Sequence, residues 1–291
     1  MGNNVIISCD SSADLSPALL RKFNIPVNAA PILVDDEVRK DMEDITPFDI
    51  FEYVEKTKKV VKTSAPNVAE YVEFFRPLVT EGNEIIHFTI SSLMSAGYNN
   101  CRLASEEFEG VYAIDSKNLS TGIGLLVLHA VKMRDAGKSA IEIVTEIEEL
   151  RDRVDASFIL DTLEYMRKGG RCSSVAALGA NLLQLKPCIE VKNGAMGVGR
   201  KYRGKQAMVL DEYVRARLSD VEDIVPDTIF ITHSHTPQDV VDVVRERIQS
   251  LIPFSNIYET YAGCTVSVHC GPNTLGILFI RRTPLTKNTA K

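Results

Sequence analysis

The sequence predicts an α/β protein that has an N-terminal parallel-sheet α/β domain and a C-terminal α+β domain. At 291 residues the chain is long enough for two domains of about 150 residues each. Its first half alternates short apolar runs with helical patterns, which predicts a parallel sheet covered by helices. Its second half changes to helices, a hairpin and closing strands. We expect the two domains to cover residues 1–156 and 157–291.

The elements of the first half follow one theme, in which an apolar run ends in a hydroxyl-rich turn and a helical pattern follows. After the second run, Pro66 is typical of a first helical turn. The last helix carries apolar residues at helical spacing among charged ones. The predicted strands are 5–8, 60–62, 85–90 and 111–114, and the predicted helices begin near Leu15 and Pro66 or cover 123–133 and 138–154.

The second half begins with two short helices that Gly169 and Gly170 separate. The turn Asn193-Gly194 lies between two apolar runs, which is a strong hairpin signal. Periodic and alternating patterns predict the remaining elements. In order, the expected elements are helices at 161–168 and 174–185, hairpin strands at 188–191 and 198–202, a helix at 205–218, a strand at 228–232, a helix at 237–251, and strands at 264–269 and 275–281.

Composition argues against several classes of protein. The formal net charge is −6 and the isoelectric point is near 5.5, so we expect no nucleic-acid partner. No apolar stretch approaches the ~20 residues of a membrane span, and the run at 5–7 is too short for a signal peptide. The six cysteines form no Cys-x-x-Cys pair, so we expect reduced thiols, no zinc site and a cytoplasmic location.

The hydroxyl-rich turns are the first candidate site. In an open α/β sheet the ligand binds beyond the carboxyl ends of the strands, and each turn precedes a helix whose free N–H groups favour an anion. The turns contain few cations and the chain has no phosphate-loop motif, so a singly charged carboxylate is favoured over a nucleotide. The alternative is that these Ser, Thr and Asp residues only cap helices, which is their commonest role.

Histidines and basic clusters give further candidates. His269 is expected at the end of a strand beside a Gly-Pro turn, where an imidazole could orient a bound anion. His87 lies inside an apolar strand and is expected to be a core residue with paired ring nitrogens. The basic segments 167–171 and 200–205 are either solvated turns or docking sites for an anion or a partner.

Six short motifs follow one another along the chain. They are Asp10-Ser-Ser-Ala-Asp-Leu15, Thr63-Ser-Ala-Pro-Asn67, Ile90-Ser-Ser-Leu-Met-Ser95, Asp115-Ser-Lys-Asn-Leu-Ser-Thr-Gly122, Leu163-Glu-Tyr-Met-Arg-Lys-Gly-Gly-Arg171 and His269-Cys-Gly-Pro-Asn-Thr-Leu-Gly276. Taken together they resemble the DegV family, the fatty-acid-binding proteins that serve bacterial fatty acid kinase. No single motif is decisive, but six in the family's order are a specific signal. The resemblance covers about residues 3 to 282 and implies a DegV-like fold.

The resemblance implies a site for the carboxylate of a long-chain fatty acid. By this likeness a hydroxyl of the Thr63-Ser64 turn and the hydroxyl of Ser95 hold the carboxylate, and His269 joins their hydrogen-bond network. Ala96 stands where the family usually has glycine. Because glycine allows unusual backbone angles, this difference could alter the N–H group that points at the ligand.

The resemblance also implies a carrier that is not itself an enzyme and that needs no cofactor besides the bound fatty acid. The acid would lie in a buried apolar tunnel while a fatty acid kinase converts its carboxylate to an acyl phosphate, which is used in phospholipid synthesis. Arg171 and Arg203 match basic residues that are implied in contacts with the kinase or with the phosphate. Contact with a membrane would be transient at most.

The tunnel walls are expected to include Leu125, Leu126 and Leu128 and the leucines at 182–185, although all of these could instead be core residues. Two other functions stay open. Dihydroxyacetone kinases have a related fold, so a phosphoryl-transfer enzyme subunit acting on a small polar substrate is one alternative. A regulatory lipid sensor is the other.

Overall fold

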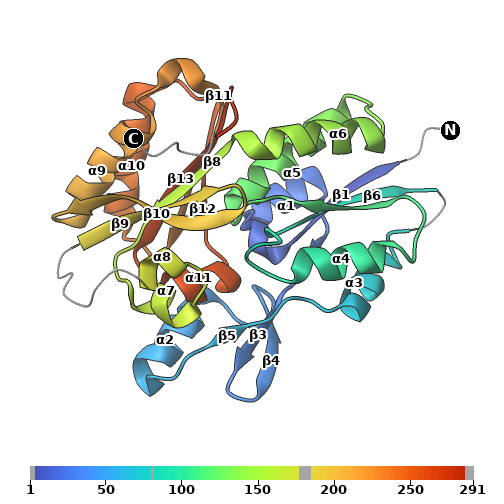
Figure 1. Cartoon of the computed structure of the whole chain (residues 1–291), viewed down its shortest axis with the longest axis horizontal. Helices are drawn as coiled ribbons and strands as arrows, with labels where there is room; N and C mark the ends of the chain where they lie inside the picture. The colour runs from blue at the N-terminus through green and yellow to red at the C-terminus, as the bar shows by residue number, and fades with distance from the viewer. Residues whose placement is uncertain (1–3, 80–81, 177–184, 286–291) are drawn as a thin grey trace.

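The structure is a computed structural model that describes residues 4–79, 82–176 and 185–285. Three sheets organise these residues (Figure 1). The first is parallel, in the order β2-β1-β6-β7, and the second is a mixed sheet in the order β10-β9-β8-β13-β11-β12. The third is a small antiparallel sheet in the order β4-β3-β5. The chain therefore has the α/β fold class that the sequence predicts.

The strands of the parallel sheet are β1 Val5–Asp10, β2 Val27–Asn28, β6 Glu84–Thr89 and β7 Val111–Asp115. Those of the small sheet are β3 Pro31–Val34, β4 Glu37–Lys40 and β5 Lys62–Thr63. Those of the six-stranded sheet are β8 Val154–Ile159, β9 Leu185–Lys192, β10 Ala195–Arg203, β11 Ile224–Ser234, β12 Asn256–Tyr261 and β13 Thr274–Arg281. The predicted hairpin is confirmed as β9 and β10 around Asn193-Gly194.

The helices cover the sheets and connect them (Figure 1). They are α1 Pro17–Phe23, α2 Pro47–Thr57, α3 Val68–Phe75, α4 Gly97–Ser105, α5 Thr121–Asp135, α6 Ala140–Leu150, α7 Glu164–Gly169, α8 Ser173–Ala176, α9 Gln206–Arg217, α10 Gln238–Leu251 and α11 Cys264–Cys270. Short 3-10 helices lie at Ser11–Ala13, Arg151–Arg153 and Val221–Asp223. Beyond Ala176, the rest of the helix predicted at 174–185 falls outside the described residues, except for Leu185 in β9.

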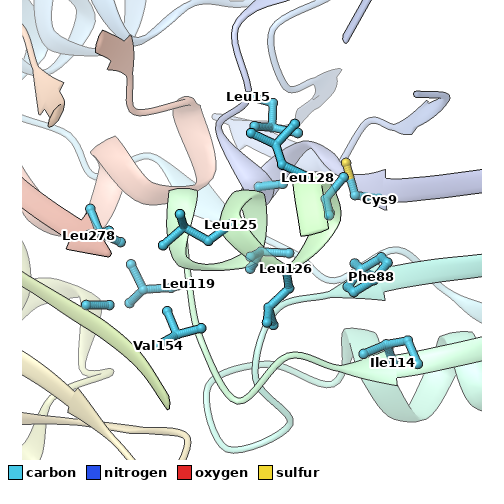
Figure 2. Close-up of a cluster of buried hydrophobic side chains, with 14 of the residues drawn as sticks. Cys9, Leu15, Phe88, Ile114, Leu119, Leu125, Leu126, Leu128, Val154 and Leu278 are labelled. Atoms are coloured by element: carbon cyan, nitrogen blue, oxygen red, sulfur yellow. The ribbon is translucent and has the colours of Figure 1, made fainter. Parts of the chain in front are cut away.

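Helix α5 lies between the parallel sheet and the six-stranded sheet and joins them through one hydrophobic core (Figure 2). Phe88 and Ile114 of the first sheet and Val154 and Leu278 of the second are buried in the same cluster as Leu126 of α5. Burying each such side chain contributes about 1.5–3 kcal/mol, so this shared core holds the two sheets together. The predicted domain division between residues 156 and 157 falls within β8, and it stays a prediction.

The three leucines predicted in the tunnel wall, Leu125, Leu126 and Leu128, belong to this core (Figure 2). Helix α5 is apolar around most of its surface, since it is covered by elements of both sheets. The core alternative therefore accounts for these leucines. The corresponding prediction for Leu182 and Leu183 lies outside the described residues.

The strand that carries Thr63 joins a different sheet from the one predicted. Strand β5 pairs antiparallel with β3, where Ile32 lies opposite Thr63, so the Thr63 turn is not at the edge of the parallel sheet. An apolar run predicts a strand but does not identify its partner. Pro66 also differs from prediction, because it precedes α3, and Asn67 is the N-cap that accepts from the N–H group of Glu70 at 3.1 Å.

The predicted strand at 264–269 is wrong, because this segment is the helix α11. Its β-branched residues Thr265, Val266 and Val268 favour a strand locally. His269 consequently lies in the last turn of a helix and not at a strand end. Strand β12, which precedes this helix, was not predicted from the sequence.

Two buried carboxylates explain why this segment is helical. Asp14 accepts from the N–H group of Gly263 at 2.8 Å, and Asp41 accepts from those of Cys264 at 2.8 Å and Thr265 at 3.1 Å. These groups open α11, where the N–H groups lack partners within the helix. Hydrogen bonds from residues more than 200 positions away thus override the local preference of the sequence.

Candidate functional site

Thr63 and His269 come from distant parts of the chain and meet at one point. Thr63 ends β5, His269 lies in the last turn of α11, and Thr63 Oγ1 is 3.0 Å from Nε2 of the imidazole. Helix α11 packs against β5, α2 and α7, which holds the imidazole at this place (Figure 1). The structure therefore brings together two of the residues that the sequence singled out.

Two cavities meet at this pair, and both are lined by Thr63, Arg171 and His269. The inner cavity has a volume of about 90 Å³, is also lined by Ser64 and Ser95, and is otherwise mainly apolar. Its apolar wall includes Ile90, Met94, Leu119, Phe158, Met166 and Val266. The outer cavity has a volume of about 260 Å³ and is bordered by Lys59, Lys62, Glu164 and Lys168 above an apolar floor.

The environment of His269 favours one tautomer of the imidazole. Nδ1 is buried and has no hydrogen-bond partner within the described residues, whereas Nε2 faces the Thr63 hydroxyl. A buried N–H group without an acceptor is rarer in proteins than an unfilled lone pair. The hydrogen is therefore assigned to Nε2, which donates to Thr63 Oγ1. The hydroxyl hydrogen of Thr63 is then free to donate to a ligand.

Ser95 is arranged in the same way. Its hydroxyl oxygen accepts from the N–H group of Gly97 at 3.2 Å, and its hydroxyl hydrogen has no acceptor within the described residues. The Ser95 turn is tied to the Thr63 turn because Asn100 Nδ2 donates to the carbonyl oxygen of Pro66 at 2.8 Å. Each hydroxyl oxygen is thus occupied by a fixed donor. The site offers two O–H donors, which suits an anion such as a carboxylate.

The charge state of His269 suits this role. Burial, together with the nearby Arg171 guanidinium, lowers the pKa of His269 from 6.5 to about 4. The imidazole is therefore neutral near pH 7, and the positive charge at the cavity comes from Arg171. The ring lies so close to α7 that a Cβ atom at Gly169 would be 2.2 Å from Nδ1. The glycine of this motif gives the imidazole its space.

The remaining predicted site residues are exposed, and only one of them lines a cavity. Ser64 lines the inner cavity and its side chain is exposed. Ala96 is exposed, is not among the residues that line either cavity, and has the helical angles φ −74° and ψ −6°, which need no glycine. Arg203 is exposed at the end of β10 and lines neither cavity.

The alternative role as helix caps fails for one of the turns. Ser120 occupies the N-cap position of α5 but makes no side-chain cap bond; instead it donates to Asp14. The prediction for His87 is confirmed, since the ring is fully buried with Nδ1 2.9 Å from Ser8 Oγ and Nε2 3.2 Å from Asp10 Oδ1. His87 lines neither of the two cavities, and its paired ring nitrogens place it in the framework of the fold.

Several residues of the site were missed by the sequence analysis. Met94 and Met166 line the inner cavity and stand inside motifs that had been singled out only for their polar residues. An apolar residue within a polar motif is a signal that could have found them. Two lysines border the outer cavity: Lys62, which directly precedes the Thr63 turn, and Lys168, which belongs to the basic segment 167–171 that the sequence indicated as a possible docking site.

Two further observations concern metal ligands and membrane-spanning helices. Within residues 4–79, 82–176 and 185–285, no group of three or more His, Cys, Asp or Glu side chains is arranged to hold a metal ion. None of the helices in this part of the chain combines the length and the apolar character that a membrane span requires.

Comparison with known proteins gives consistent matches along the chain. A family model described as "Uncharacterised protein, DegV family" matches residues 4–282. A DegV domain-containing protein of Clostridium acetobutylicum is 31% identical over 281 residues, which cover 95% of this chain and 98% of that protein. A relative of the same description from Deinococcus radiodurans is 28% identical and is covered over 97% of its length.

Solved structures agree with these matches. A fatty-acid-binding DegV family protein from Thermus thermophilus superposes with a TM-score of 0.87 at 26% identity, covering 96% of this chain and 99% of that one. A stearic-acid-binding protein from Eubacterium ventriosum superposes with a TM-score of 0.83 at 25% identity, covering 97% and 99%. The fold described above is therefore shared along almost the whole length of both proteins.

Proposed function

The chain belongs to the DegV family, and from this premise we propose that it binds a long-chain fatty acid. The carboxylate would accept hydrogen bonds from Thr63 and Ser95 beside the neutral imidazole of His269, and the tail would enter the inner cavity. One observation carries the proposal: a mainly apolar cavity is lined by two hydroxyl groups whose hydrogens are free to donate and by one guanidinium. The fatty acids bound by the Thermus thermophilus and Eubacterium ventriosum proteins support it.

The tail and the carboxylate would make different contributions to binding. Burying about 14 methylene groups at ~0.8 kcal/mol each provides on the order of 11 kcal/mol before the costs of association. Each hydrogen bond to a charged carboxylate adds about 1.5–3 kcal/mol. The tail would therefore dominate affinity, while Thr63, Ser95 and His269 would fix where the carboxylate lies.

A path for the tail follows from the cavity walls. Leu119, Phe158, Val266 and Cys270 line the inner cavity and also a smaller neighbouring cavity of about 30 Å³. Movement of these shared side chains would join the two spaces into one channel. A long tail needs such a channel, since the inner cavity alone has room for roughly three water molecules at ~30 Å³ each.

The protein would act as a carrier subunit rather than as an enzyme. We propose that a fatty acid kinase docks at the mouth of the cavity and transfers a phosphoryl group from ATP to the bound carboxylate. Arg171 lines both cavities and is exposed, and Arg203 is also exposed, which supports roles for both in docking or in contact with the phosphate. For this function the chain needs no cofactor, and its ligand is the fatty acid.

Native mass spectrometry of the purified protein tests the carrier function directly. We expect a co-purified long-chain acid and no ATP hydrolysis by the chain alone. An empty protein that hydrolyses ATP would support the alternative of a phosphoryl-transfer enzyme subunit instead.

Ser95→Ala tests the site within this function. The variant loses one hydrogen bond to the carboxylate, so we expect fatty acid affinity to fall by about 10- to 100-fold while the fold is retained. Calorimetric titration with palmitate measures the affinity, and denaturant unfolding measures the fold. Ser219→Ala, at an exposed serine outside both cavities, is the matched control. Unchanged affinity in Ser95→Ala would count against the assignment.

A further inference from the structure

The two hydroxyl groups of the candidate site come from different sheets. Thr63 ends β5 of the small antiparallel sheet, and Ser95 follows β6 of the parallel sheet. A carboxylate has two oxygens, so two O–H donors bind it best when each one faces an oxygen, and a hydrogen bond weakens steeply as the donor turns away. The grip on a carboxylate therefore depends on what holds the two turns at a fixed spacing.

The apolar cores on the two sides are separate. Val61, just before β5, is buried in a cluster with residues of β3, α2 and α11. Cys101 of α4, the helix that follows the Ser95 turn, is buried in another cluster with residues of α3, β6 and β7. The inner cavity lies where the two turns meet, since Thr63 and Ser95 both line it. A polar contact is therefore needed to fix their spacing.

One side chain connects the two turns. Asn100, at the start of α4, donates from Nδ2 to the carbonyl oxygen of Pro66 at 2.8 Å, and its side chain is half-buried. Within the part of the chain that the structure describes, no other hydrogen bond joins the segments 62–67 and 90–100. This single bond is the direct polar link between the strand end that carries Thr63 and the turn that carries Ser95.

Both ends of this bond are fixed locally. Asn67 follows the accepting carbonyl group and caps α3: its side chain accepts from the N–H group of Glu70 at 3.1 Å, and its own N–H group donates to Glu70 Oε2 at 2.6 Å. On the other side, the N–H group of Asn100 donates to the carbonyl oxygen of Ala96, the residue after Ser95, at 3.0 Å. The bond thus connects two well-defined points of the backbone.

We propose that Asn100 is a positioning residue, which sets the spacing of the Thr63 and Ser95 hydroxyls and thereby makes the site select a carboxylate over a neutral head group on the same tail. This inference rests on the proposed function, because it assumes that the head group of the ligand lies between these two hydroxyls. A neutral alcohol has one oxygen, so it can pair with either hydroxyl whatever their spacing. Asn100 lines neither cavity and acts through the two turns.

Calorimetric titration of Asn100→Ala with dodecanoate and with 1-dodecanol tests this role, since the two ligands have tails of the same length. Without the side-chain amide the two turns are no longer linked, so one of the two hydrogen bonds to the carboxylate weakens. We expect dodecanoate to bind about fivefold to tenfold more weakly, and the affinity for 1-dodecanol to change by less than about twofold. Damage to the fold or to the cavity would instead weaken both ligands equally.

Asn99→Ala is the matched control, because it makes the same change at the neighbouring position of the same helix, with the same gain in helix propensity. Asn99 is exposed and lines neither cavity. This variant should bind both ligands as the wild type does. If Asn100→Ala weakens both ligands equally, or neither of them, the positioning role is overturned. The same loss of selectivity in Asn99→Ala would also overturn it.

A double-mutant cycle shows whether Asn100 acts through the Ser95 hydroxyl. In the Ser95→Ala background one of the two donors is already absent, so no spacing is left to set. We expect Asn100→Ala to change the dodecanoate affinity of that background by less than about twofold. Losses that multiply in the double variant would contradict the positioning role. A wild type that binds neither dodecanoate nor 1-dodecanol would instead overturn the proposed function, on which this inference rests.

Discussion

At the N-terminal end of α11, three successive backbone N–H groups meet the carboxylates of Asp14 and Asp41, whereas at its C-terminal end the His269 ring has one nitrogen paired and one unpaired. The first end is further secured by side chains, since Asp41 also accepts from Thr265 Oγ1 at 2.7 Å and from Ser11 Oγ at 3.1 Å. The second end is bordered by two cavities.

The polar groups at the N-terminal end of α11 stabilise the helix, whereas those at its C-terminal end are available to a ligand. Where the protein satisfies every hydrogen bond itself, the polar groups fix a structure and have nothing left to offer. Where it occupies only the acceptor side of Thr63 and Ser95, the hydroxyl hydrogens stay available in a fixed place. One short helix therefore transmits the rigidity of a buried polar cluster to a binding residue two turns away.

Removing the support at the first end should have the largest effect. Asp41→Ala leaves the N–H groups of Cys264 and Thr265 without acceptors, and each unpaired group in the interior costs about 1–3 kcal/mol. We expect the free energy of unfolding to fall by about 4 kcal/mol in urea denaturation. Asp36→Ala, at an exposed aspartate of the same region, should change it by less than about 0.5 kcal/mol. Wild-type stability in Asp41→Ala would show that this carboxyl group does not stabilise the N-terminal end of α11.

The two ends should also respond to pH in opposite directions. Burial and Arg171 lower the pKa of His269 to about 4. Between pH 4 and 6.5 the imidazole is therefore protonated in the unfolded chain and neutral in the native state. Its contribution to stability is complete above pH 6.5 and is lost as the pH falls toward 4. Burial raises the pKa of Asp14 from 3.8 to about 8, so its contribution is complete below pH 3.8 and is lost as the pH rises toward 8.

Variants at each end make these opposite slopes visible. Relative to His269→Gln, the wild type should gain about 3 kcal/mol of unfolding free energy as the pH rises from 4 to 6.5, and no more above it. Relative to Asp14→Asn, it should lose stability over the range from pH 4 to 8. Urea unfolding across this range measures both differences. If both variants keep the wild-type pH profile, these two groups do not titrate in the way that their surroundings imply.

The same comparison explains which parts of the fold the sequence predicts. Local patterns predict β1, β6 and β7, and the Asn-Gly turn predicts the β9–β10 hairpin, because the determining residues are neighbours in the chain. Helix α11 could not be predicted in this way. Its β-branched residues favour a strand, and the carboxyl groups that make it a helix stand at positions 14 and 41.

For the candidate site, the motifs indicated Thr63, Ser95 and His269, and the structure places all three at the inner cavity. The apolar wall could not be predicted, because a side chain that faces a cavity and one that faces the core have the same character. Leu119 and Phe158 line the inner cavity, while Leu125 and Leu126 are covered by the two sheets. Only the arrangement of the sheets around α5 separates these two groups.

The smallest expected effect concerns the space around the His269 imidazole, at the C-terminal end of α11. Gly169→Ala places a Cβ atom 2.2 Å from His269 Nδ1, so the imidazole or α7 must move. In an unobstructed helix the same change would stabilise by about 0.5–1 kcal/mol, so any loss reports on the imidazole. We expect palmitate affinity to fall by about tenfold and the NMR signals of the His269 ring to shift, because the hydrogen bond to Thr63 is displaced.

Gly197→Ala is the control, since nothing lies within 4 Å of a Cβ atom there. Wild-type affinity together with an unmoved imidazole in Gly169→Ala would show that the position of His269 is not set by this contact.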